Sequence, residues 1–127
     1  MRFYSLTSDT MEPDRLAPDY RSAREIGVVR LGERIFYFRR YRKIYYIPYR
    51  EIRRCFRRVM LVPARLCCGK GELSVENLVI CGDKGELAQI QLPGERAGKA
   101  LLEELKLRAP DADFGYWKKG MEAEEER

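Results

Sequence analysis

Short runs of branched and aromatic side chains, separated by turn residues, fill the first half of the chain. They cover residues 28–31, 35–39 and 44–49, and side chains of these types favour sheet. A basic turn, residues 40–43, joins the second run to the third, so the pattern predicts a β-hairpin. Pro48 cannot donate a ladder hydrogen bond, and we expect it at an edge, a bend or a strand end.

The second half of the chain repeats this pattern and then changes to a helical period. Residues 73–81 and 86–92 flank the glycine-containing link GDKG, which predicts a second hairpin. Over residues 95–108 the apolar side chains recur on one face of a helix, and Pro110 ends the pattern. Gly98 lies on that apolar face, where its missing Cβ would let the helix approach a sheet closely.

The segment between these two halves fits two different elements. Apolar side chains recur every three or four positions from Tyr49 to Met60, with arginines between them, and this spacing predicts a basic amphipathic helix. As a strand the segment alternates poorly, because Arg53 and Arg57 interrupt the apolar face. Periodicity alone therefore favours the helix.

Residues 34–58 are the most basic and most aromatic part of the chain. They contain ten of its 25 Lys and Arg and eight of its 14 aromatic residues, and Glu51 is their only acid. The local charge is +9 in a protein of net charge +5. Such a block is the polar face of strands wrapped around a core, a surface that meets an anion, or both.

The chain divides into three parts. Residues 1–27, broken by Pro13 and Pro18, predict an N-terminal arm with a short helical turn after Pro18. Residues 28–109 contain the predicted strands and helix and form the folded domain. Residues 110–127 form a charged tail whose end we expect to be disordered.

The ends and the apolar runs of the chain bear on its compartment. The N-terminus lacks the apolar region of a secretory signal, and no apolar run approaches the roughly 20 residues that a membrane-spanning helix needs. We therefore expect the cytoplasm, and we leave peripheral contact with a membrane open. The cysteines would then be reduced thiols. They are Cys55, Cys67, Cys68 and Cys81.

The order of these elements, together with one junction motif, resembles the bacterial pleckstrin-homology (PH)-like domains. The junction consists of Ile47, Pro48, Tyr49, Glu51 and Ile52. The resemblance covers residues 28–108 and implies a mainly β fold, a curved antiparallel barrel of about seven strands capped by a C-terminal amphipathic helix. It also implies that residues 50–62 form a strand with a bulge, after a short turn at residues 50–52, in place of the helix.

The basic turn is the first candidate site. In phosphoinositide-binding relatives of the wider superfamily, basic residues flank the loop between the first two strands, and the resemblance places four residues of this chain there. They are Arg39, Arg40, Arg42 and Lys43. Arginine suits such a site because its planar fork donates two charge-assisted hydrogen bonds to one phosphate. A solvated hairpin with no ligand is the competing interpretation.

A second basic group offers an alternative function. It comprises Arg50, Arg53, Arg54, Arg57 and Arg58. With nearby tyrosines this face could bind nucleic acid, with phosphates on arginines and bases stacked on rings. A third hypothesis is a protein interface formed by strand addition at a sheet edge.

Catalytic and metal chemistry find little support in the chain. Without histidine the usual nucleophilic triads are excluded, and Glu103 and Glu104 fall on the outside of the predicted helix. The cysteines lack the C-x-x-C spacing of zinc sites. We therefore expect a binding or scaffold module with no cofactor, whose partner is an anionic lipid surface or an acidic protein, and less readily nucleic acid.

Overall fold

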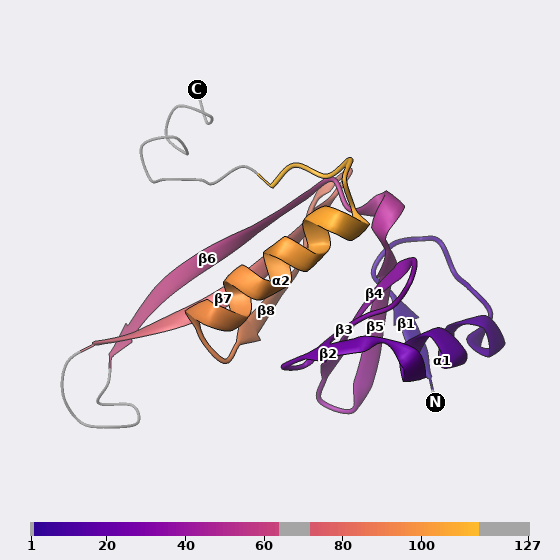
Figure 1. Cartoon of the computed structure of the whole chain (residues 1–127), viewed down its shortest axis with the longest axis horizontal. Helices are drawn as coiled ribbons and strands as arrows, with labels where there is room; N and C mark the ends of the chain where they lie inside the picture. Colours follow the sequence, from indigo (N-terminus) through magenta and orange to yellow (C-terminus); the bar gives the residue numbers. More distant parts are fainter. Residues whose placement is uncertain (1, 64–71, 115–127) are drawn as a thin grey trace.

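A computed structural model describes residues 2–63 and 72–114. Within them the protein is mainly β, with eight strands in two sheets, two α-helices and one 3₁₀ turn (Figure 1). The elements are β1 (Phe3–Ser5), α1 (Pro13–Ser22), β2 (Arg24–Ile26), β3 (Val29–Leu31), β4 (Ile35–Arg40), β5 (Lys43–Pro48), η1 (Tyr49–Glu51), β6 (Arg54–Pro63), β7 (Glu72–Gly82), β8 (Gly85–Leu92) and α2 (Glu95–Arg108).

Both faces of the first sheet are covered. Its strand order is β1-β5-β4-β3-β2, with β1 parallel to β5 and the other neighbours antiparallel. On one face, Tyr37 and Tyr46 pack with Leu16 and Tyr20 of α1. The opposite face, including Phe36, enters the main core. Because β4 and the end of β5 are buried on both faces, they are apolar at consecutive positions.

The second sheet carries the C-terminal helix. Its order is β6-β7-β8, all antiparallel, and α2 runs along it (Figure 1). Leu101 and Leu105 of α2 are fully buried in the main core with Leu78 and Ile90 of the sheet. The predicted close approach at Gly98 is confirmed, because a Cβ there would lie 3.2 Å from Glu76 Cγ.

The helix that periodicity predicted over residues 49–60 is wrong. The 3₁₀ turn η1 is followed by β6, which pairs with β7 without a register shift from Arg54 to Pro63. The strand implied by the resemblance is present, but its bulge is not, and the register shift lies between β7 and β8 at Ile80 and Cys81. Alternation fails for another reason. Arg57 lies on the helix-facing side of β6 with Cys55, where its guanidinium donates a hydrogen bond to the buried carboxylate of Glu76.

The N-terminal segment is built into the fold. Strand β1 pairs with β5, and α1 begins at Pro13 rather than after Pro18. The ladders of the described residues leave two sheets and do not close into a barrel. No described helix has the length and apolarity to cross a bilayer. The end of the tail, where we expected disorder, lies outside the described residues, as do Cys67 and Cys68.

Candidate anion-binding sites

The first candidate site is the exposed end of the β4–β5 hairpin. Arg40 pairs with Lys43, so only Tyr41 and Arg42 make the turn. Both have positive φ, 59° and 137°, as two-residue turns that match the twist of a hairpin commonly require. We call Arg39, Arg40, Tyr41, Arg42 and Lys43 the hairpin tip. All five residues are exposed, and Tyr41 retains 90% of its accessible surface.

Two cations of the hairpin tip lie against aromatic rings. The Arg40 guanidinium is 5.5 Å from the centre of the Phe38 ring and donates a hydrogen bond to the Gln89 carbonyl. The Lys43 ammonium is 5.3 Å from the centre of the Tyr4 ring. In the described part of the chain, none of the four cations of the tip forms an ion pair with an acid. Their charge is therefore not neutralised locally.

The arginines of the second basic group do not share one face. Arg57 lies on the helix-facing side of β6 and donates two hydrogen bonds to Glu76, from Nε to Oε2 at 2.6 Å and from Nη2 to Oε1 at 3.0 Å. Glu76 is 6% exposed. Arg53 precedes β6 and pairs with Asp83 at 2.6 Å. These two arginines are bound to acids of the second sheet and its β7–β8 turn.

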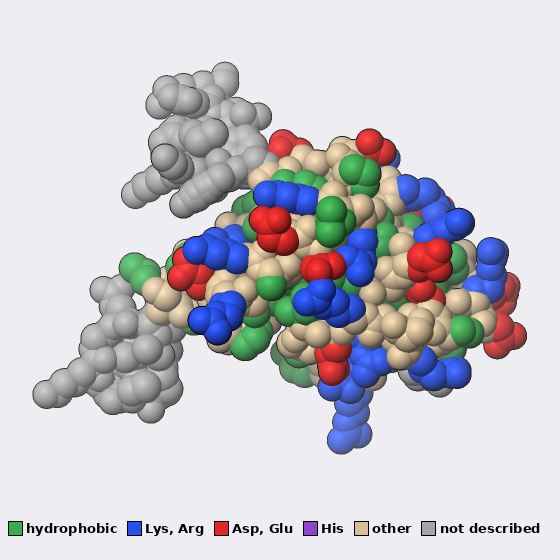
Figure 2. All heavy atoms as spheres, viewed as in Figure 1, with side chains coloured by type: hydrophobic (Ala, Val, Ile, Leu, Met, Phe, Trp, Pro, Cys, Tyr) green, Lys and Arg blue, Asp and Glu red, His purple; other side chains and the backbone are tan. Residues whose placement is uncertain are grey.

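The opposite face of β6 holds two more of these arginines around one ring. The guanidinium carbons of Arg54 and Arg58 lie 4.7 and 5.5 Å from the centre of the Phe56 ring. Arg58 also pairs with Glu86 at 3.2 Å and donates to the Gln89 side chain at 2.7 Å. In Figure 2, Lys and Arg side chains over the second sheet and α2 are interspersed with acids, whereas cationic side chains project where the hairpin ends.

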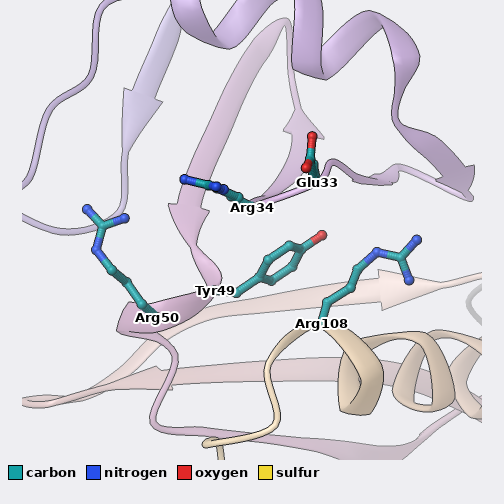
Figure 3. Close-up of a pocket in the computed structure, with 5 residues that line it drawn as sticks. All are labelled: Glu33, Arg34, Tyr49, Arg50 and Arg108. Carbon is teal, nitrogen blue, oxygen red and sulfur yellow. The ribbon is translucent and has the colours of Figure 1, made fainter.

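The last member of the group, Arg50, lies in a separate hollow (Figure 3). The hollow has a volume of about 270 Å³ and is lined by residues from three segments. They are Glu33, Arg34, Tyr49, Arg50 and Arg108, which we call the arginine hollow. Sequence reasoning did not bring Arg34 or Arg108 to this site. Arg34 stands inside the basic block with no distinguishing motif, and Arg108 is more than fifty positions away from Tyr49 along the chain.

Hydrogen bonds between η1 and the turn before β4 fix the floor of the hollow. The Tyr49 amide donates to the Arg34 carbonyl at 3.0 Å, and the Tyr49 hydroxyl donates to the Gly32 carbonyl at 2.7 Å. Burial raises the pKa of Tyr49, although the Arg108 cation opposes the shift. The hydroxyl is therefore a neutral donor at physiological pH, and the ring lies between Arg50 and Arg108 (Figure 3).

One acid beside the hollow is already engaged. Glu104 pairs with both Arg108 and Arg24. The hydrogen bond from Arg108 and the charge of Arg24 lower the pKa of Glu104. Arg108 is thereby held at the edge of the hollow, while Glu33 supplies the carboxylate of the lining.

Within residues 2–63 and 72–114, no three Cys, Asp or Glu side chains are grouped so that they could hold a metal ion. Burial raises the pKa of the Cys55 thiol, and the thiol is 0% exposed.

Comparisons with protein-family models, curated proteins and solved structures give no match for this chain.

Proposed function

We propose that this protein is a non-enzymatic binding module of the PH-like class, which attaches to anionic lipid headgroups through its hairpin tip. The PH-like assignment draws support from the antiparallel ladders and the C-terminal helix on the second sheet. The site assignment draws support from charge, backbone conformation and side-chain exposure at the tip. An acidic protein surface is the related partner with the same charge requirement.

The main support for this function is the contrast between cations that form ion pairs within the fold and cations that do not. Arg53, Arg57 and Arg58 are bound to acids within the fold, whereas the tip cations have no acid partner among the described residues. An exposed cation contributes about 1 kcal/mol to attraction by an anionic membrane. Four such cations supply about 4 kcal/mol, which is roughly a thousandfold in affinity.

The backbone of the turn supports a functional role for its side chains. Tyr41 and Arg42 occupy the positive-φ region, where glycine or asparagine would fit at lower cost. Holding an ordinary residue there costs on the order of 1–3 kcal/mol, and such residues concentrate at binding sites. The backbone cost at these two positions therefore supports a role for the Tyr41 and Arg42 side chains that glycine or asparagine would not provide.

Tyr41 favours lipid over protein as the anionic surface. Its ring projects from the end of the hairpin with 90% of its surface accessible, between cations on both strands. Tyrosine partitions to the membrane interface, where the ring meets acyl chains and the hydroxyl remains hydrated. A ring flanked by cations can therefore enter the headgroup layer while the cations bind phosphate.

Nucleic acid lacks comparable support. The arginines proposed for that role are distributed over both faces of β6, the position just before β6, where Arg53 pairs with Asp83, and the arginine hollow. A backbone-tracking groove needs cations along one surface, with rings open for stacking. Phe56, the ring among them, is 8% exposed.

Vesicle flotation tests the proposal. The variant in which Arg39, Arg40, Arg42 and Lys43 are all changed to Gln should lose binding to phosphatidylserine vesicles by about a hundredfold or more. A charge-matched control changes four exposed helical cations to Gln and should retain most of the binding. These control residues are Arg15, Arg21, Arg96 and Lys106.

A turn variant separates the side chains from the hairpin. Tyr41→Asn with Arg42→Gly supplies residues that prefer this turn, so folding stability should be kept or raised while vesicle binding falls. Binding that survives in the four-residue tip variant, or falls equally in the helical control, would refute the site. Tight binding to duplex or single-stranded nucleic acid at physiological salt, with none to vesicles, would replace the proposed function.

A further inference from the structure

The arginine hollow is a second cationic site, at the other end of the same hairpin. Arg34 stands immediately before β4 and Tyr49 immediately after β5, whereas the hairpin tip joins the opposite ends of these strands. Six residues of strand separate the two sites by about 20 Å. A surface bound by the tip does not need to reach the hollow.

Two guanidinium groups in the hollow retain their hydrogen-bond donors. The Arg34 side chain forms no hydrogen bond or ion pair with any residue of the described chain. Arg50 forms a long, exposed ion pair with Asp9, at 3.9 Å between Nη2 and Oδ2, which is beyond hydrogen-bond distance. In Figure 3 both guanidinium groups lie on the same side of the Tyr49 ring, and Arg108 lies on the other.

The number of donors selects the chemistry of the ligand. Each arginine offers a planar fork that satisfies two acceptor oxygens. A carboxylate has two oxygens and would occupy one fork, whereas a phosphate monoester has three terminal oxygens that share up to two negative charges and can bridge two forks. Glu33 lines the same hollow, and its carboxylate can accept a hydrogen bond from a hydroxyl group on the compound that carries the phosphate.

We propose that the arginine hollow binds a soluble, hydroxyl-bearing phosphate monoester between Arg34 and Arg50, independently of the hairpin tip. The floor of the site is already positioned, because both hydrogen bonds of Tyr49 connect η1 to the turn that carries Arg34. Binding therefore requires ordering of two exposed side chains and no rearrangement of backbone. The exposed positions also mean that substitutions there leave the core intact.

The test is an NMR titration of the full chain with inorganic phosphate at constant ionic strength. The Nε–Hε resonances of Arg34 and Arg50 should shift and saturate, while acetate at the same ionic strength should give no saturable shift. Arg34→Gln and Arg50→Gln should each weaken phosphate binding about tenfold or more, the loss expected for a charge-assisted hydrogen-bonded contact. Arg96→Gln, an exposed arginine on α2, is the matched control and should bind as wild type.

Two further arms separate this site from the hairpin tip and from lipid. The four-residue tip variant should bind phosphate as wild type, and the Arg34→Gln/Arg50→Gln double variant should float with vesicles as wild type. Non-saturable shifts, unchanged affinity in Arg34→Gln, or equal binding of acetate would overturn the proposed site. Loss of vesicle binding in the double variant would assign the hollow to lipid phosphate and overturn the soluble ligand.

Discussion

The ion pair between Arg57 and Glu76 gives a sharp test of the energetics beneath α2. It lies between the second sheet and the helix, where Gly98 leaves space for it. The two residues differ in exposure and in whether a second ion-pair partner lies nearby. Glu76 is 6% exposed and bonds to Arg57, whereas the Arg57 side chain is 23% exposed and has a second acid, Glu95, at 3.7 Å. Removing the cation should therefore cost much more than removing the acid.

The magnitudes follow from this asymmetry. Arg57→Leu leaves the Glu76 carboxylate buried without a cation, and breaking a buried pair in this way costs about 3–5 kcal/mol. We expect the lower end, about 3 kcal/mol, because Arg57 is not fully buried. Glu76→Leu removes a charge that folding must desolvate, and Arg57 can turn to Glu95, so we expect about 1 kcal/mol or less. The double Leu variant should also lie near 1 kcal/mol, which gives a coupling energy of about 2–3 kcal/mol.

Urea unfolding at neutral pH, followed by circular dichroism, measures these differences as changes in the free energy of unfolding. Arg58→Leu is the control on the same strand. It removes a half-exposed pair with Glu86, which should contribute no more than about 1 kcal/mol. Equal costs for the two single variants would refute the reasoning.

Two more predictions concern the packing of α2 and the buried tyrosines. Gly98→Leu should destabilise the fold by about 1–3 kcal/mol, because its side chain would enter the space held by the Arg57–Glu76 pair; an unchanged urea midpoint would contradict the close approach. Burial raises the pKa of Tyr37, with a hydrogen bond to Asp19, and burial also raises that of Tyr49. Their contribution to stability is complete below about pH 10, the ordinary tyrosine value, and above it falls by about 1.4 kcal/mol per pH unit for each ring. Absorbance should show these two rings ionising together with unfolding, and their titration in the folded protein near pH 10 would contradict the assignment.

Local residue type was enough to place most strands and the C-terminal helix. Branched and aromatic side chains marked the strands at residues 35–39 and 86–92, and the apolar stripe at residues 95–108 marked α2 with matching bounds. Pro48 ended β5 as its missing N–H required. In each case the deciding interaction is a backbone preference or a single buried face, and a short stretch of sequence contains it.

Residues 49–60 show where such reasoning failed. The spacing of their apolar side chains fits a helix because Arg57 interrupts the strand alternation, and the acid that makes this position tolerable belongs to β7. The N-terminal residues show the same limit, since β1 forms hydrogen bonds with β5 some forty positions later. Pairing between distant segments produces no periodic pattern of residue types in a short stretch of sequence, so it becomes visible only in the assembled sheets.

The sequence by itself determined a mainly β chain with a C-terminal helix and located the basic turn between two strands. Tertiary structure alone decided which cations remain available. It neutralised Arg53, Arg57 and Arg58 with acids from other segments, left the hairpin tip without such partners, and brought Arg34 and Arg50 together beside Tyr49. The physical reason is that the sequence shows only how many charges a segment contains. The electrostatic interaction of each charge depends on its distance from other groups after folding.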